Sequence, residues 1–328
     1  MINCYRRSFL RIVGTVVCAA LGIANSLAQQ NYPTKPIRMI LGFAAGSQAD
    51  VTARNITPRL SQILGQQILF ENRVGASGAI GAEFVARSPA DGYTLLLATT
   101  ADSILPALRA DLPYDLVRDF APVSLLAIGP QVLVVKAALP VQSVKELIAL
   151  AQAQPGKLTY GSTGVGTLTH LAGELLKSKA KINILHVPYK GGADSAVATA
   201  AGEVDMTFPA IPSALPLMNA GKLRALAISG PKRMAIMPAV PTWEELGMSG
   251  WDRMAWYGVL APAATPKDII ARLNGAIVKV LAAPELKEGL NKDGREPQAT
   301  TPEQFAAYIS RELSENRELM KATGAKGD

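Results

Sequence analysis

The stretch IRMILGFAAGSQAD, residues 37–50, decides the fold. Its first five residues form an apolar run typical of a buried strand, and a loop of small residues then leads into a helical pattern after Asp50. The first N–H groups of a helix have no partner within the helix, so such a junction offers them to an anion. The stretch therefore predicts a loop that binds a carboxylate or phosphate, although a strand-to-helix turn without a ligand has the same sequence features.

A second stretch, YGSTGVGT at residues 160–167, repeats this order of strand, small-residue loop and helix start. Two such loops far apart in the sequence suggest two lobes that present N–H groups to one shared ligand. The glycines do not form a dinucleotide-binding fingerprint, because Thr169 occupies the third glycine position, and no Walker sequence is present. Nucleotide binding is therefore disfavoured.

Strand-like and helix-like segments alternate along the whole chain, which predicts an α/β fold with largely parallel sheets. Capping boxes or Thr-Pro pairs predict helix starts at residues 143, 242, 265 and 301. The expected strands lie at residues 37–41, 67–70, 94–98, 123–128, 132–135, 157–160, 184–186, 204–208, 226–229 and 257–261.

Residues 1–28 have the pattern of a cleaved export signal. Three arginines precede an uncharged apolar stretch over residues 12–23, and Ala28 ends a small-residue cleavage motif. The pair Arg6-Arg7 also resembles a twin-arginine signal. We expect a mature chain that begins near Gln29 and is soluble and periplasmic, because no later apolar segment is long enough to span a bilayer.

Composition argues against several classes of function. Both cysteines, Cys4 and Cys18, lie in the export segment, so the mature chain should have no disulfide and no thiol nucleophile. Without the three arginines of that segment, 30 basic and 26 acidic residues give a formal charge of +4. No basic block is present, so we expect no nucleic-acid partner. His170 and His186 lack metal-ligand spacing, and we expect no metal and no cofactor.

A series of short motifs runs in order from Tyr32 to the C-terminal helix. Besides the two loops, they are YPTKPI (32–37), ENR (71–73), DGYTL (91–95), LPYD (112–115), DFAPV (119–123), PGKL (155–158), HLAGE (170–174), HVPYKG (186–191), AGKLRA (220–225) and YG (257–258). With this set the chain resembles the periplasmic substrate-binding proteins of tripartite tricarboxylate transporters, often called the Bug family. Members of that family bind a ligand and catalyse nothing.

The resemblance implies a two-lobed fold like that of periplasmic binding proteins, with a ligand cleft between the lobes. Lobe one would comprise residues 29–128 plus 255–328, and lobe two residues 129–254. Strands near 123–128 and 257–261 would form the hinge. The implied partners are a small organic acid, gripped through backbone groups and water, and the membrane permease subunits that receive it from a monomeric binding protein.

The first loop departs from the family pattern, because relatives usually have a proline-rich version with two glycines there. Pro209 and Ala210 also stand where relatives often have polar residues. The resemblance therefore leaves the bound acid open, and a less polar pocket for an aromatic or longer-chain acid is one alternative.

We thus expect an exported solute-binding protein for an organic carboxylate. One alternative is an exported hydrolase that uses Ser162 and His170, although the sequence around Ser162 is not the Gly-x-Ser-x-Gly elbow. Another is a sensor subunit that presents its ligand to a membrane receptor kinase. The expected site residues, with Asp50 positioning the first loop rather than facing the carboxylate, are Phe43, Ala44, Ser47, Gln48, Asp50, Thr99, Thr100, Asp102, Ser162, Thr163, Gly166, Thr167, His170 and Ala210.

Overall fold

The computed structural model describes residues 32–251, 253–292 and 294–323. The expected export signal, its cleavage position and the twin-arginine motif lie outside these ranges. Within them, none of the helices combines the length and the hydrophobicity that crossing a bilayer requires.

The first of two sheets has six strands in the order β11-β4-β10-β3-β1-β2. Strand β1 pairs parallel with β2 and β3, whereas β10 pairs antiparallel with β3 and β4. Its members are β1 (Ile37–Leu41), β2 (Ile68–Asn72), β3 (Thr94–Thr99), β4 (Phe120–Gly129), β10 (Ala255–Pro262) and β11 (Glu296–Pro297).

The second sheet has five strands in the order β7-β6-β8-β5-β9. Strand β6 pairs parallel with β7 and β8, and β5 pairs antiparallel with β8 and β9. The strands are β5 (Val132–Lys136), β6 (Thr159–Ser162), β7 (Leu185–Pro188), β8 (Met206–Thr207) and β9 (Leu223–Ile228).

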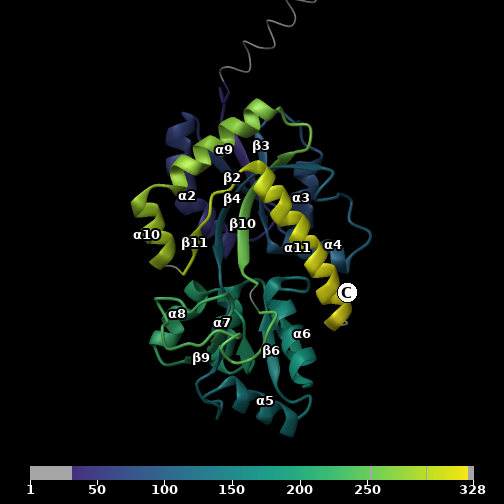
Figure 1. Cartoon of the computed structure of the whole chain (residues 1–328), viewed down its shortest axis with the longest axis vertical. Coiled ribbons are helices and arrows are strands. Elements are labelled where there is room, and N and C mark those ends of the chain that lie inside the picture. Colours follow the sequence, from purple (N-terminus) through teal and green to yellow (C-terminus); the bar gives the residue numbers. More distant parts are fainter. Residues whose placement is uncertain (1–31, 252, 293, 324–328) are drawn as a thin grey trace, which may run out of the picture.

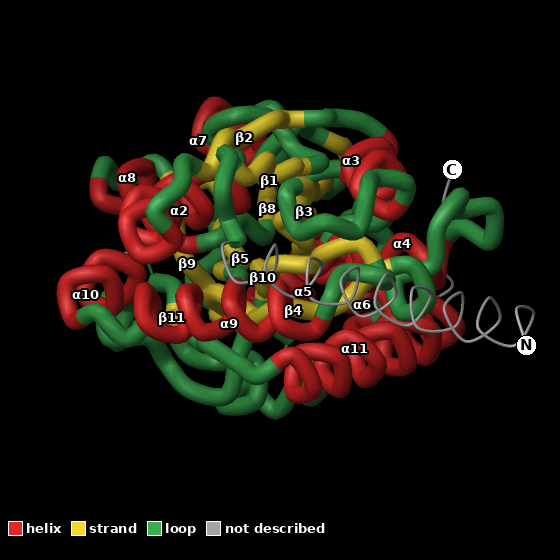
Figure 2. Tube along the Cα trace, turned by 90° about the horizontal axis from the view of Figure 1, so that it is seen from above, coloured by secondary structure: helices red, strands yellow, loops and turns green. Residues whose placement is uncertain are grey.

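Each sheet is covered by helices, and the two sheets with their helices form two lobes (Figure 1). Seen from above, the strands lie in the interior, with α2 and α10 to one side and α3 and α4 to the other (Figure 2). The helices are α2 (Gln48–Leu64), α3 (Ala79–Ala86), α4 (Thr100–Leu108), α5 (Val144–Ala153), α6 (Leu168–Ala180), α7 (Gly192–Ala201), α8 (Ile211–Asn219), α9 (Lys267–Leu281), α10 (Pro284–Lys292) and α11 (Pro302–Thr323), with a short 3-10 turn, η1 (Ala76–Gly78).

Apolar cores on both faces of the six-stranded sheet fix its helices. One core packs α2 and α9 against the strands, and another packs α3 with Phe305 and Ile309 of α11. The far end of α11 reaches the second lobe, where Leu319 packs against the core of the five-stranded sheet. Helix α11 therefore bridges the lobes on one side of the molecule.

The expectation of largely parallel sheets is wrong, because both sheets are mixed. Strand β4 leads out of the six-stranded sheet, and the chain returns to that sheet through β10 after it has formed the five-stranded sheet and helices α5 to α8. The first residue of β10, Ala255, pairs with the last residue of β4, Gly129, so the chain re-enters the sheet at the end where it left and the two strands run antiparallel. All ten expected strands overlap observed ones, but the short β11 was not expected.

A helix predicted to start at Thr242 is a single turn. Its capping box does form, since the Thr242 N–H donates to Glu245 Oε2 at 2.7 Å and the Glu245 N–H donates to Thr242 Oγ1 at 3.2 Å. Gly247 then adopts a φ of 74°, which ends the turn. Trp243 and Trp251 stack in the core with ring centroids 3.9 Å apart, so packing draws the chain inward where a helix would continue.

The strands of the six-stranded sheet come from both ends of the described chain, and those of the five-stranded sheet come from its middle. This distribution is what a division into residues 29–128 plus 255–328 and residues 129–254 requires. We keep those boundaries as a proposal.

Gly258 provides a test of the packing between β10 and α11. A Cβ at this position would lie 2.2 Å from the ring of the buried Phe305. We expect Gly258→Ala to lower the free energy of unfolding by about 1–3 kcal/mol through overpacking. Gly275→Ala is the control, because this glycine lies within α9 and a Cβ there meets no atom within 4 Å. Denaturant unfolding should show that the control is neutral or stabilising.

Candidate functional site

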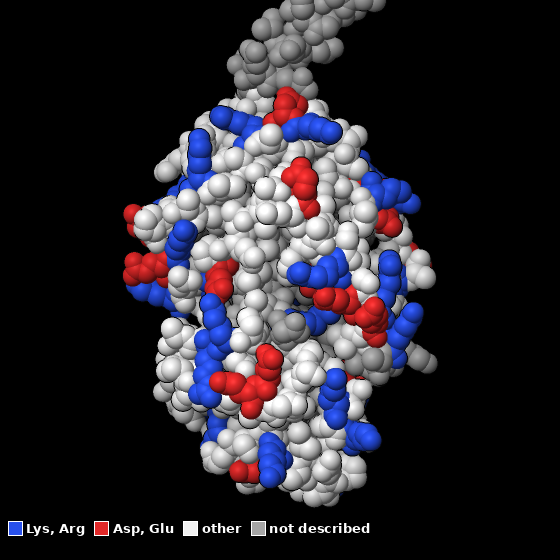
Figure 3. Space-filling view, viewed as in Figure 1, with Lys and Arg blue, Asp and Glu red and all other residues white. Residues whose placement is uncertain are grey.

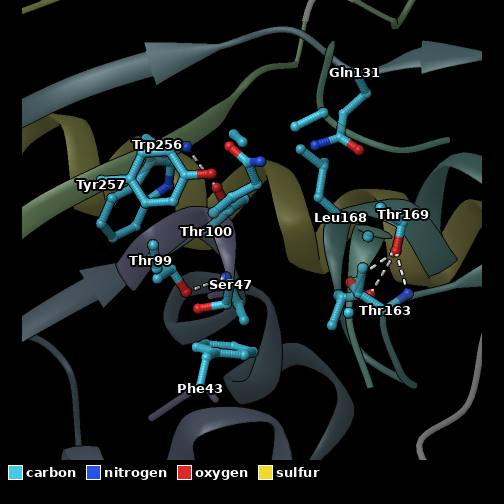
Figure 4. A pocket seen from close by; sticks show the side chains of 18 of the residues that line it. Phe43, Ser47, Thr99, Thr100, Gln131, Thr163, Leu168, Thr169, Trp256 and Tyr257 are labelled. Carbon is cyan, nitrogen blue, oxygen red and sulfur yellow. Dashed lines mark hydrogen bonds between the residues drawn. The ribbon is translucent and has the colours of Figure 1, made fainter. Parts of the chain in front are cut away.

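Five helices begin around one cavity between the lobes. Their N-caps are Ser47 of α2, Thr99 of α4, Thr167 of α6, Gly191 of α7 and Ala210 of α8. All five residues line the cavity, which holds about 670 Å³ with its open mouth included. Figure 4 shows the cavity from close by, with Ser47 and Thr99 among the labelled residues. Because first-turn N–H groups carry the positive end of the helix dipole, the cavity attracts an anion.

The first loop, between β1 and α2, is held in shape by Asp50. Its Oδ2 accepts the Gly46 N–H at 3.0 Å and Arg54 Nε at 2.8 Å, while its own N–H donates to Ser47 Oγ at 3.3 Å. Burial raises the pKa of this carboxyl, but the hydrogen bonds from Arg54 and Gly46 outweigh burial and hold the pKa below its ordinary value. Asp50 is thus ionised at neutral pH and fixes the loop from behind the cavity wall.

Gly42 opens the same loop and leaves no space for a side chain. A Cβ there would lie 2.4 Å from the Cα of Gly78, which precedes α3. The small residue lets β1 and η1 approach each other closely, so this contact fixes where the first loop turns toward the cavity.

The second loop, between β6 and α6, is cross-linked by three threonine hydroxyls. Thr169 Oγ1 lies 2.9 Å from both Thr163 Oγ1 and Thr167 Oγ1, and it accepts the Thr163 N–H at 2.8 Å. Thr167 Oγ1 also donates to the Gly164 carbonyl at 2.7 Å. These bonds, some of which are drawn in Figure 4, set the path of the loop, and Thr163, Thr167, Leu168 and Thr169 line the cavity.

A third junction, between β3 and α4, carries a complete capping box. The Thr99 N–H donates to Asp102 Oδ2 at 2.7 Å, and Thr99 Oγ1 accepts the Ala101 N–H. Burial raises the pKa of Asp102 from 3.8 to about 6, although the bonds from Thr99 oppose this shift. Thr100 Oγ1 accepts the Trp256 N–H at 2.8 Å and ties this helix start to β10.

The hydrolase alternative requires Ser162 and His170 as a pair, but the histidine within hydrogen-bond distance of the Ser162 hydroxyl is His186. Ser162 Oγ lies 2.6 Å from Nε2 of His186, and it accepts the Gly164 N–H at 3.0 Å. The ring of His170 instead packs on that of His186, with centroids 4.5 Å apart. Ser162 is fully buried and is not part of the cavity wall. The hydrolase alternative is therefore not favoured.

The structure brings most of the expected site residues to the cavity. Those that line it are Phe43, Ser47, Gln48, Thr99, Thr100, Thr163, Thr167 and Ala210. Those that are not part of its wall are Ala44, Asp50, Asp102, Ser162, Gly166 and His170.

Sequence reasoning missed other residues of the wall, namely Ala49, Ala101, Gln131, Leu168, Thr169, Lys190, Gly191, Gly192, Ala255, Trp256 and Tyr257. A local signal did exist for the start of α7, because Gly191 and Gly192 form another small-residue junction between strand and helix. No local signal marks Gln131 or Tyr257, which reach the cavity only through the segments that join the two sheets.

Of the described residues that line the cavity, only Lys190 is charged, and it is exposed. On the face drawn in Figure 3, basic and acidic side chains are interspersed. The electrostatic preference of the cavity therefore comes chiefly from backbone dipoles. Across the described ranges, no group of three or more His, Cys, Asp or Glu side chains is arranged to hold a metal.

Two hydrogen bonds join the lobes around the cavity. Gln48 Nε2 of α2 donates to Ser213 Oγ of α8 at 3.2 Å, and Ser77 Oγ of η1 donates to the Val165 carbonyl in the second loop at 2.9 Å. Ser77 has a left-handed backbone conformation, with φ 54° and ψ 33°. These contacts hold the two lobes together over the cavity.

An α/β protein with two lobes and an anion-attracting cavity between them belongs to the class of solute-binding proteins. Residues 52–325 match the model of the family described as "Tripartite tricarboxylate transporter family receptor", and the chain belongs to this family. The resemblance found in the sequence, the two-lobed fold and the solute-binding role are thereby confirmed.

Individual relatives agree with this assignment. Protein BugT of Bordetella pertussis is 35% identical over 319 residues, which cover 97% of this chain and 98% of BugT. The structure of R. palustris Rpa4515 with adipate has 34% identity and a TM-score of 0.85, covering 90% of this chain and 99% of that one. MatC from Rhodopseudomonas palustris with bound malate has 30% identity and a TM-score of 0.82, covering 88% and 99%.

Asp102 provides a pH test of the α4 junction. Its folded-state pKa of about 6 exceeds the ordinary value of 3.8, so the folded protein binds a proton more readily than the unfolded chain. Stability from this group is therefore present below pH 4 and is lost as the pH rises to 6. Relative to wild type, Asp102→Asn should gain about 2–3 kcal/mol in free energy of unfolding between pH 4 and 7.

Asp119→Asn is the control for that measurement. The hydrogen bond from Arg118 lowers the pKa of Asp119 to about 2, so this carboxylate is ionised in both states above pH 5. Its stability difference from wild type should be constant between pH 5 and 7. A constant difference for Asp102→Asn as well would show that this buried carboxyl has an ordinary pKa.

Proposed function

We propose that this protein captures a small organic carboxylate between its lobes and delivers it to the membrane subunits of a tripartite tricarboxylate-type permease. The observation that carries the proposal is the convergence of five helix N-termini on a cavity whose described lining includes no acidic side chain. Each N-terminus is equivalent to roughly half a positive charge. A carboxylate between them would exchange water for preorganised N–H donors.

The ligands of relatives support a carboxylate. One related structure contains adipate and another contains malate. We infer that the direct contacts come from the expected residues that line the cavity, above all the first-turn backbone groups beside Ser47, Thr99 and Thr167. Asp50 and Asp102 would act by holding their loops, because neither belongs to the wall.

Cellular placement is inferred from the family and from the N-terminal sequence. We infer that the protein acts in the periplasm as a monomer, after cleavage near Ala28, and that it binds its ligand without turning it over. Mass spectrometry of the mature N-terminus would test the cleavage position.

Ligand binding should close the lobes and stabilise the protein. Each lobe provides only part of the helix N-termini, so full hydrogen bonding of a carboxylate requires the closed form. Adding adipate or malate should raise the melting temperature with concentration and reduce the radius of gyration in small-angle scattering. The matching diamides lack the charge and should do neither. Equal stabilisation by acid and diamide would contradict the proposed carboxylate grip.

A negative charge at the N-cap of α2 should weaken ligand binding without unfolding the protein. Asp is as good an N-cap as Ser, so Ser47→Asp keeps the cap but places a like charge beside the carboxylate. We expect a loss of affinity of about tenfold or more by calorimetry. Ser143→Asp makes the same change at the N-cap of α5, away from the cavity, and should bind normally. Equal affinities for the two variants would exclude α2 from the site.

A further inference from the structure

We propose that Gln131 determines specificity by forming hydrogen bonds to an uncharged end of the ligand. The preferred ligand is then a monocarboxylate that also carries a hydroxyl or carboxamide group. This inference rests on the proposed function, because it concerns the same cavity. It names the chemical class of acid that the cavity accepts.

Gln131 is held rigidly where the chain passes from one lobe to the other. It lies between β4 and β5, and its N–H donates to Ser229 Oγ at 2.8 Å while its carbonyl accepts the Ser229 N–H at 2.9 Å. A bridge to Ala210 fixes it next to the start of α8. With the backbone bonded on both sides, the side chain has a defined direction into the cavity (Figure 4).

The Gln131 side chain is buried, and its amide oxygen has no hydrogen-bond partner in the described part of the chain. The residue is 8% exposed, and its Oε1 is buried with no bond. Buried polar atoms are nearly always hydrogen-bonded, so an orphaned amide that lines a cavity points to a ligand group. Leaving such an atom unpaired in a complex lowers affinity by roughly five- to a hundredfold.

The hydrogen-bonding capacity of an amide specifies which ligand group can pair with it. Whichever way it is turned, Gln131 presents one acceptor oxygen and one NH₂ donor. A hydroxyl or carboxamide both donates and accepts, so it can pair with both halves. A carboxylate can only accept, and would leave Oε1 facing another oxygen. The amide therefore favours a neutral group over a second carboxylate.

The surroundings of Gln131 also disfavour a second charge. Behind it lies a narrow apolar crevice, walled mainly by Leu168, Leu171, Ala172, Leu175, Phe208, Trp243 and Trp251. Arg253 borders this crevice, but its charge is matched by Glu312 at 3.0 Å and Glu315 at 4.0 Å. A carboxylate in this crevice would lose water and would meet a cation that is already paired with two carboxylates.

An ammonium group is excluded by a similar argument. Among the described residues that line the cavity there is no Asp or Glu, so a buried amine cation would meet no counter-charge from them. Gln48 adds another amide to the wall, with its Oε1 also buried and unbonded. Neutral donors on the ligand would satisfy both oxygens, and this leaves hydroxyl and carboxamide as the matching groups.

Isothermal titration calorimetry with matched acids tests the proposal. At each of two chain lengths, four and six carbons, the panel contains the plain alkyl acid, the terminal hydroxy acid, the dicarboxylate and its monoamide. We expect the hydroxy acid and the monoamide to bind wild type at least tenfold more tightly than the alkyl acid and the dicarboxylate of the same length.

Gln131→Met keeps the size of the side chain and removes its hydrogen bonding. It should erase the preference by weakening the hydroxy acid and monoamide about tenfold, with the alkyl acid unchanged or tighter. Gln154→Met, at the exposed end of α5, is the control and should preserve the wild-type order. An unchanged melting temperature without ligand would show that both variants are folded.

The outcomes separate this inference from the function on which it rests. Carboxylate binding with the dicarboxylate or alkyl acid as tight as the hydroxy acid overturns the role of Gln131 and leaves the proposed function intact. A preference that persists in Gln131→Met likewise assigns it to another residue. If folded wild type binds no acid of the panel, both proposals are overturned.

Discussion

The unpaired N–H groups of five helices, turned toward one cavity, are the constraint on which the rest of the structure depends. Capping side chains satisfy some of these groups, and the others must meet water or a ligand because no intrahelical partner exists for them. The fold places them at the carboxyl ends of strands in both sheets, so that neither lobe holds a complete site. The buried capping networks around Asp50, Asp102 and Thr169 keep these ends in place.

The charge of the site therefore resides in the backbone rather than in basic side chains. A dipole fixed by a helix cannot move away or change protonation, whereas a lysine or arginine would bring a mobile charge and a desolvation cost of its own. This arrangement leaves the side chains of the wall free to differ among relatives while the grip on an anion is retained. Gln131 lies where such variation would change the ligand without disturbing a helix start, because it stands between β4 and β5.

Sequence reasoning predicted the parts of this structure that are encoded locally. The strand at residues 37–41 and the loop before Gln48 were predictable because hydrophobic periodicity and capping chemistry act over a few residues. Gln131 and Tyr257 were not predictable, because they enter the cavity through the pairing of distant segments. The turn at Thr242 shows the limit of the local signal: its capping box forms, but packing of Trp243 determines the path of the chain after the first turn.

The bonds from Gln48 to Ser213 and from Ser77 to Val165 have a kinetic consequence. Both join the lobes through protein groups alone, so they contribute to closure whichever ligand is present. Before a ligand departs, these bonds must break, and their strength sets part of the residence time. Substitutions at Ser77 or Ser213 would therefore change how quickly the ligand is released, with little effect on which ligand is bound.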